Sequence, residues 1–83
     1  MGNNQVKGKN YRRAISYYTK AIELHKDGVY YANRSLCYFK LEEYEKALQD
    51  CFECVKLKPD YFITYVRISA IMIKFRRIQE SYD

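Results

Sequence analysis

The chain has 83 residues and a formal net charge of +5, and 48% of its residues are apolar. That length allows one small domain, and that apolar content excludes a disordered chain. The sequence has no apolar run near the roughly 20 residues of a membrane span, its N-terminus is too polar for a signal peptide, and its three cysteines do not form the even set of a secreted disulfide framework. We therefore expect a single domain over residues 1–83, in the cytoplasm and with reduced thiols.

The beginning of the chain predicts a short helix followed by a longer one. The short helix covers Gly2–Lys7 and ends at Gly8, because glycine is a poor helix former. A second helix is expected over Tyr11–His25, where apolar residues recur at helical spacing. Asp27 and Gly28 then predict a turn.

The stretch that ends at Pro59 predicts two antiparallel helices with a tight connection. Apolar and small residues recur at helical spacing over Val29–Leu41 and again over Glu43–Leu57. Glu42 lies in the polar break between them, and Pro59 cannot continue the second helix. This arrangement is an αα-hairpin.

Beyond Pro59, the pattern predicts a fifth helix from about Asp60 to Phe75 and the start of a sixth over Ile78–Asp83. The pair Arg76 and Arg77 interrupts the apolar pattern between them. Four apolar residues of the fifth helix have little chain left to cover them: Ile68, Ile71, Met72 and Phe75. We expect the chain to self-associate or to exchange helices through this surface.

The predicted helices recur at a near-constant interval. Aligned residues of the second and fourth helices are 33 positions apart: Tyr11 and Tyr44, Ala14 and Ala47, Ile15 and Leu48, Tyr18 and Cys51, Ala21 and Cys54. In the third copy the interval is 34 residues, as from Tyr31 to Tyr65 and from Ser35 to Ser69. A two-helix unit repeated at this interval predicts a stacked helical array.

The middle unit resembles the tetratricopeptide repeat (TPR) family. The family pattern of large, small and aromatic residues with a closing proline is matched by Tyr31, Ser35, Tyr38, Tyr44, Ala47, Cys51, Cys54 and Pro59. The resemblance covers nearly the whole chain. It implies an all-α fold, an αα-hairpin superhelix of about two and a half repeats. Repeat 1 would cover about residues 1–27, repeat 2 about 28–60, and a partial repeat 3 about 61–83.

In this family the first helix of each repeat lines a concave surface. The corresponding face here is apolar and carries amides and cations, but no acidic residue: Asn3, Val6 and Lys7, then Ala32, Asn33, Leu36, Phe39 and Lys40, then Ile63, Val66, Arg67, Ala70, Ile73 and Lys74. Such a face suits an extended peptide with apolar side chains and a carboxylate. The candidate peptide-binding residues are Asn3, Lys7, Asn33, Leu36, Lys40, Arg67 and Lys74.

Several of these positions are similar to the co-chaperone branch of the family, which includes the Hsp-organising adaptor and protein phosphatase five. That branch holds the C-terminal Glu-Glu-Val-Asp tail of cytosolic heat-shock chaperones in a carboxylate clamp. The resemblance implies that Asn3 and Asn33 bond the terminal carboxylate, that Lys40 lies near the peptide, and that Arg67 pairs with an acidic side chain or a carbonyl. It therefore implies a protein or peptide partner, which would be the C-terminal tail of a heat-shock chaperone if the clamp is sufficiently complete.

Two departures leave another peptide open as the ligand. Ile63 stands where the family has a clamp lysine, four residues before Arg67, and the first-helix lysine of the family would lie before Met1. Asn33 also has a structural interpretation, as a residue that bridges neighbouring repeats. A TPR scaffold for a different peptide is thus the alternative to a clamp.

The remaining motifs do not indicate an enzyme. Cys51 and Cys54 form a CxxC pair, but they lie within a helix at interior repeat positions, where cysteine acts as a small apolar residue. His25, near a helix end, suits an interaction with the helix dipole. We expect no catalytic residues, cofactor or metal site. Ten tyrosines among basic residues leave a basic RNA-binding or assembly module as a further alternative.

Overall fold

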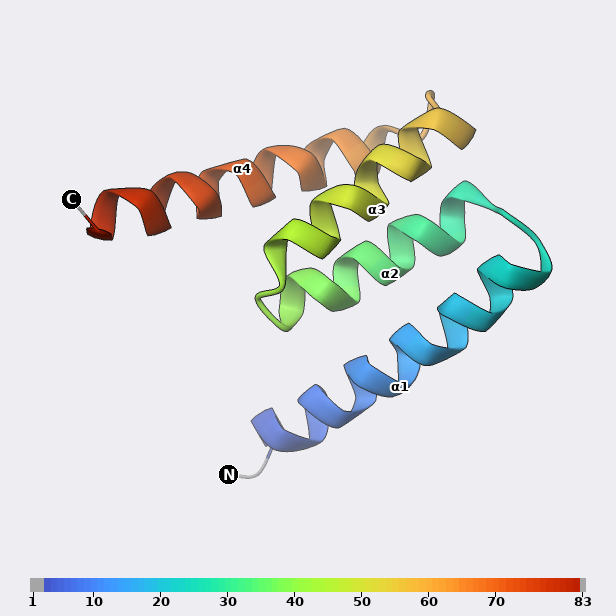
Figure 1. Cartoon of the computed structure of the whole chain (residues 1–83), viewed down its shortest axis with the longest axis horizontal. Coiled ribbons are helices and arrows are strands. Elements are labelled where there is room, and N and C mark those ends of the chain that lie inside the picture. The colour runs from blue at the N-terminus through green and yellow to red at the C-terminus, as the bar shows by residue number, and fades with distance from the viewer. Residues whose placement is uncertain (1–2, 83) are drawn as a thin grey trace.

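The computed structural model of the chain describes the backbone of residues 3–82 and the side chains of residues 10–78. Within that range it contains four helices and no strand: α1 (Asn3–Leu24), α2 (Gly28–Lys40), α3 (Tyr44–Leu57) and α4 (Phe62–Tyr82). Successive helices run in opposite directions, and α1 and α4 lie at the two ends of a flat stack (Figure 1). The predicted all-α fold of αα-hairpins is confirmed.

The hairpin of α2 and α3 begins and turns where local chemistry requires. Asp27 caps α2, because its Oδ1 accepts a hydrogen bond of 2.9 Å from the backbone N–H of Val29. At the other end, the N–H groups of Glu42 and Glu43 donate to the carbonyls of Phe39 and Tyr38, at 3.0 and 2.9 Å. Glu42 has a φ of 63°. This is a Schellman motif, which closes α2 and directs the chain into α3.

The core lies between successive helices and is rich in small side chains. One cluster of buried residues joins the first three helices: Ile22, Tyr31, Ala32 and Cys54. A second joins α3 to α4: Ala47, Cys51 and Ile71. Small residues at these positions allow the helices to approach closely, and each hairpin then covers its neighbour.

The predicted separate first helix is wrong. Gly8 and Asn10 are helical, and α1 runs without interruption from Asn3 to Leu24. A glycine within a helix costs about 1 kcal/mol, whereas a break would leave backbone groups at two new helix ends without partners. The segment before Tyr11 therefore extends α1 instead of forming a helix of its own beside α2.

The predicted break at Arg76 and Arg77 is also wrong. These residues lie within α4, which continues to Tyr82. Arginine is a good helix former, and the segment contains neither glycine nor proline, so a change in polarity alone does not end the helix. The predicted sixth helix is therefore the last part of α4. Among the helices of residues 3–82, none has the length and apolarity needed to cross a bilayer.

Candidate peptide-binding groove

A groove of about 180 Å³ lies between α2 and α4. The two helices run in the same direction, with α3 antiparallel to both (Figure 1). Seven residues line the groove: Leu36, Phe39 and Lys40 from α2, and Ile63, Val66, Arg67 and Ala70 from α4. Five of them are apolar and two are cations, so the groove combines an apolar surface with positive charge.

Arg67 joins the two walls of the groove. Its Nη1 donates a hydrogen bond of 3.0 Å to the backbone carbonyl of Ala32, on α2. A guanidinium has five N–H groups in a fixed plane, and this bond occupies one of them. The half-buried side chain of Arg67 is therefore held in place while its charge stays at the groove.

Part of the apolar surface of the groove is accessible to solvent. Ile63 is 49% exposed and Val66 is 67% exposed, although both lie on α4 beside α2. Lys40 is also exposed, at the last turn of α2. A ligand that covers Ile63 and Val66 would gain hydrophobic stabilisation of about 25 cal/mol for each Å² removed from water.

The sequence candidates divide into three groups. Leu36, Lys40 and Arg67 line the groove together. Asn33 and Lys74 lie on the same two helices, but they are not among the residues that line it. Asn3 and Lys7 belong to the first turns of α1, and their side chains lie outside the described residues, so their predicted role stays a prediction.

Comparison with known proteins identifies the fold family. Residues 29–61 match one tetratricopeptide repeat model, and residues 1–27 match a second one. The chain belongs to the tetratricopeptide repeat family. No solved structure gave a significant match.

Several relatives of this TPR domain are much longer proteins. Over 82 residues it is 38% identical to "Heat shock protein STI1" of Saccharomyces cerevisiae, covering 96% of this chain and 14% of that protein. Over 85 residues it is 38% identical to human "Serine/threonine-protein phosphatase 5", covering 98% of this chain and 17% of that protein. Over 86 residues it is 34% identical to "Hsp70-Hsp90 organizing protein" of Triticum aestivum, covering 99% of this chain and 15% of that protein. The domain is thus of the co-chaperone branch and is a protein-interaction module, and it spans less than a fifth of the length of these relatives.

The TPR domain also contains a polar network that sequence reasoning missed. Arg34 donates through Nε and Nη2 to the two carboxylate oxygens of Asp50, at 2.8 and 2.7 Å, and through Nη1 to Oγ1 of Thr19 at 3.0 Å. The hydrogen bond with Asp50, above all, raises the pKa of Arg34, against the effect of burial. Arg34 therefore joins α1, α2 and α3 and has a structural role.

A sequence signal for this network existed. Arg34 lies one helical turn from both Tyr31 and Tyr38, and Asp50 lies between Ala47 and Cys54 on the buried face of α3. Two opposite charges within the buried faces of consecutive helices predict an ion pair, because a buried charge needs a partner.

All three cysteines are buried free thiols, and the sequence prediction of burial for Cys51 and Cys54 is confirmed. Sγ of Cys51 lies 3.2 Å from Oγ of Ser35, and Sγ of Cys54 lies 3.1 Å from Oγ1 of Thr64. Burial raises the pKa of the Cys51 and Cys37 thiols. Among the described residues there is no group of three histidine, cysteine or acidic side chains that could hold a metal ion.

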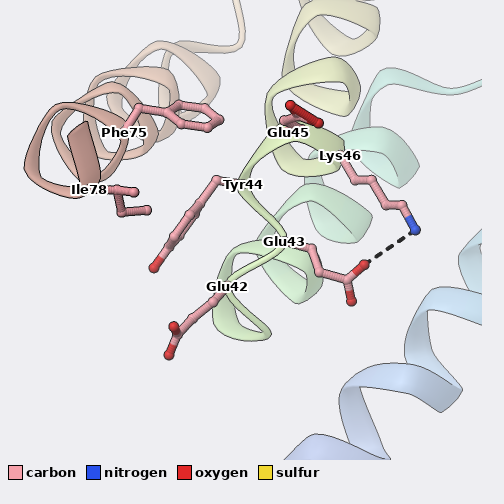
Figure 2. A pocket seen from close by; sticks show the side chains of 7 residues that line it. All are labelled: Glu42, Glu43, Tyr44, Glu45, Lys46, Phe75 and Ile78. Carbon is pink, nitrogen blue, oxygen red and sulfur yellow. Dashed lines mark ion pairs between the residues drawn. The ribbon is translucent and has the colours of Figure 1, made fainter. Parts of the chain in front are cut away.

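A second recess, of about 390 Å³, lies between the α2–α3 turn and the C-terminal half of α4 (Figure 2). Its apolar part is formed by Tyr44, Phe75 and Ile78, and its rim carries Glu42, Glu43, Glu45 and Lys46. In Figure 2, Phe75 and Ile78 point from α4 toward the α3 side of the recess. We call this recess the acidic cleft, because glutamates dominate its rim, whereas the whole chain is basic. This cleft was not predicted from the sequence.

Glu43 lies at the junction between the acidic cleft and α1. It forms ion pairs with Arg12 of α1 and with Lys46, the latter at 3.3 Å. Burial favours the protonated carboxyl, but hydrogen bonds from Lys46 and Arg12 outweigh this effect and hold the pKa of Glu43 below its ordinary value. Glu43 thus joins the α2–α3 turn to α1.

Proposed function

We propose that the groove between α2 and α4 binds an extended peptide or the C-terminal tail of another protein, through one apolar side chain and one carboxylate. The observation that carries this proposal is the position of Arg67 and Lys40 beside the exposed apolar surface of Ile63 and Val66. A hydrogen bond from a charged arginine or lysine to a carboxylate is stronger than one between neutral groups. Burial of the apolar surface adds affinity whatever the charge of the ligand.

The proposed partner is a heat-shock chaperone with an acidic C-terminal tail, bound in the cytoplasm. Support comes from the clamp-like positions in the sequence and from the relatives, two of which carry the printed names "Heat shock protein STI1" and "Hsp70-Hsp90 organizing protein". Ile63 makes this groove more apolar than the clamp pattern. A tail with a large apolar residue near its carboxylate therefore suits it better than a tail recognised by charge alone.

A titration with a peptide ending in Glu-Glu-Val-Asp tests the proposal. We expect the free-acid peptide to bind, and we expect amidation of its C-terminus or the substitution Arg67→Ala to weaken binding by about tenfold to a hundredfold, the loss of one hydrogen bond to a charged group. Lys40→Ala should weaken binding as well. Lys20→Ala, which changes another exposed lysine, on α1, is the matched control and should have no effect.

Two outcomes would redirect the proposal. If amidation and Arg67→Ala both leave the affinity unchanged, the groove is not a carboxylate site. A second peptide, of the same length, carries apolar residues but no acidic ones. If it binds equally well to the unchanged chain and no longer binds to the Val66→Asp variant, the groove serves a different class of peptide. Circular dichroism of each variant shows whether its helices are intact.

The structure gives little support to the alternative of single-stranded RNA. Base stacking needs aromatic rings that a base can reach. Among the tyrosines with described side chains, only Tyr17 and Tyr65 are exposed, and they lie on α1 and α4, at opposite ends of the stack. The other tyrosines with described side chains are buried or half-buried.

A further inference from the structure

The residues that line the groove between α2 and α4 form an exposed outer part and a half-buried inner part. The inner part consists of four residues: Leu36 and Phe39 on α2, and Arg67 and Ala70 on α4. Ala70 has the smallest side chain of all the lining residues, a single methyl group. The residue at the equivalent position of α2, 34 residues earlier, is Leu36. Alanine in place of a second leucine leaves room for a ligand side chain between the two helices.

The volume of the groove suits one large apolar side chain. It measures about 180 Å³. A cavity of about 150 Å³ can hold a benzene molecule, so the groove has room for a side chain of the size of leucine or phenylalanine. A valine side chain is smaller and leaves part of this volume unfilled.

Two cations flank the space beside Ala70 along the direction of the helices. Because α2 and α4 run in the same direction (Figure 1), the equivalent residues Leu36 and Ala70 lie at similar levels. Arg67 precedes Ala70 by three residues and Lys40 follows Leu36 by four, which places the cations about 4.5 and 6 Å from that level, in opposite directions. In an extended peptide, about 5 Å separates the terminal carboxylate from the Cα of the penultimate residue. A carboxylate on either cation therefore places the penultimate side chain beside Ala70.

The walls of this space are fixed by contacts outside it. The ring of Phe39 packs edge to face on Tyr44, with 5.6 Å between the ring centroids. The hydrogen bond from Arg67 to α2 fixes a second wall. Next to Ala70, Ile71 is fully buried against α3, which corrects the sequence prediction that Ile71 would be uncovered. A space with fixed walls discriminates between side chains by size, because it does not repack around each ligand.

We propose that Ala70 determines the size of the side chain that the groove accepts, and that the preferred tail has leucine or phenylalanine as its penultimate residue. This inference rests on the proposed function, since it takes the groove as the binding site of a C-terminal tail. It adds the ligand position that the groove reads and the residue that sets the limit of size. Arg67 and Lys40 hold the carboxylate, and Ala70 selects the residue before it.

Four peptides that differ only in the penultimate residue test the preference. They end in Glu-Glu-X-Asp, where X is alanine, valine, leucine or phenylalanine, and their affinities for the 83-residue chain are measured by calorimetric titration. We expect the affinity to rise in that order. The one CH₂ group that separates valine from leucine should give about a fourfold gain, which corresponds to about 0.8 kcal/mol.

The variant Ala70→Leu should remove this preference. Its leucine occupies the space opposite Leu36, and α4 is kept because alanine and leucine are both good helix formers. We expect the variant to bind the leucine and phenylalanine peptides at least about tenfold less tightly than the unchanged chain does, and the alanine peptide within about twofold. Ser69→Leu is the control, because it adds a leucine at an exposed residue of α4 outside the groove lining, and it should leave the preference unchanged. Circular dichroism shows whether each variant keeps its helices.

Amidated versions of the same peptides distinguish this inference from the proposed function. If amidation weakens binding but the four peptides bind alike, or if Ala70→Leu affects all four equally, the carboxylate site stands and the role of Ala70 is overturned. If affinity rises with the size of X, Ala70→Leu abolishes that rise and amidation has no effect, the role of Ala70 stands and the carboxylate site is overturned. Absence of binding by every peptide overturns both.

Discussion

Arg34 of α2 and Asp50 of α3 are joined by two parallel hydrogen bonds, and both side chains are nearly shielded from water. The carboxylate of Asp50 is 6% exposed and the guanidinium side chain of Arg34 is 17% exposed. The same guanidinium reaches Thr19 on α1. This ion pair and the hydrogen bond to Thr19 therefore link three of the four described helices, including α2, which forms one wall of the groove.

Removal of either partner should be costly. Asp50→Ala leaves the Arg34 charge without its carboxylate, and we expect a loss of about 3 kcal/mol in the free energy of unfolding, measured by urea denaturation. The double variant with Arg34→Met and Asp50→Leu should lose less than Asp50→Ala alone, since no charge is left buried. Glu45→Ala, at an exposed acidic residue of the same helix, is the control. Equal effects of Asp50→Ala and Glu45→Ala would contradict the structural role of the pair.

The regular part of this fold could be predicted from the sequence, because repeat spacing and helical periodicity report local structure. The predicted helices Val29–Leu41 and Glu43–Leu57 agree with α2 and α3 to within one residue at each end. The groove residues Leu36, Lys40 and Arg67 could be found as well, since they follow from the face of each first helix.

The ends of the stack could not be predicted in the same way. Whether a chain folds back near Gly8 or Arg76 depends on whether a neighbouring helix offers a surface for it, which periodicity does not report. The acidic cleft was missed for a related reason. It brings Tyr44 beside Phe75 and Ile78, residues about thirty positions away in the chain. Whether these side chains come together depends on the angle between α3 and α4, which periodicity does not report.

Glu42 is in a backbone conformation that favours glycine. Its φ of 63° is left-handed, which costs a residue with a side chain about 1 kcal/mol relative to glycine. Glu42→Gly should therefore increase the free energy of unfolding by roughly 0.5–1 kcal/mol. Glu42→Ala removes the charge but keeps the strain, so it separates the two effects. If Glu42→Ala stabilises the domain as much as Glu42→Gly, repulsion among the glutamates rather than backbone conformation is the cause.

Glu43 should make stability depend on pH in the acidic range. Its pKa in the folded chain is lower than its ordinary value of 4.5, because Lys46 and Arg12 outweigh the effect of burial. Its contribution is thus fully present above the unfolded pKa and is lost as the pH falls through the folded pKa. We expect Glu43→Gln to be less stable than the unchanged chain by less than about 1 kcal/mol near neutral pH. That difference should vanish in acid, and a difference independent of pH would contradict the prediction.

The thiols should be unreactive while the domain is folded. Burial raises the pKa of Cys37 and Cys51 and also keeps reagents away from them. A thiol-reactive chromophore should label the native chain at the rate at which the chain opens, and should label all three cysteines at once in denaturant. Rapid labelling of one cysteine on mixing with the native chain would show that its site is open to solvent.

Ile63 should determine whether the groove prefers an apolar or an acidic ligand. It lines the groove one helical turn before Arg67 and is 49% exposed, so a lysine there can be accommodated without disturbing the core. Ile63→Lys adds a cation beside Lys40 and Arg67, and we expect it to strengthen the binding of a peptide ending in Glu-Glu-Val-Asp by about tenfold to a hundredfold. The same change should weaken the binding of a peptide with only apolar side chains. Met72→Lys adds the same charge to α4 at a residue that is 48% exposed and outside the groove lining, and it should change neither affinity. Equal gains from Ile63→Lys and Met72→Lys would show that net charge, rather than a site beside Arg67, attracts the acidic tail.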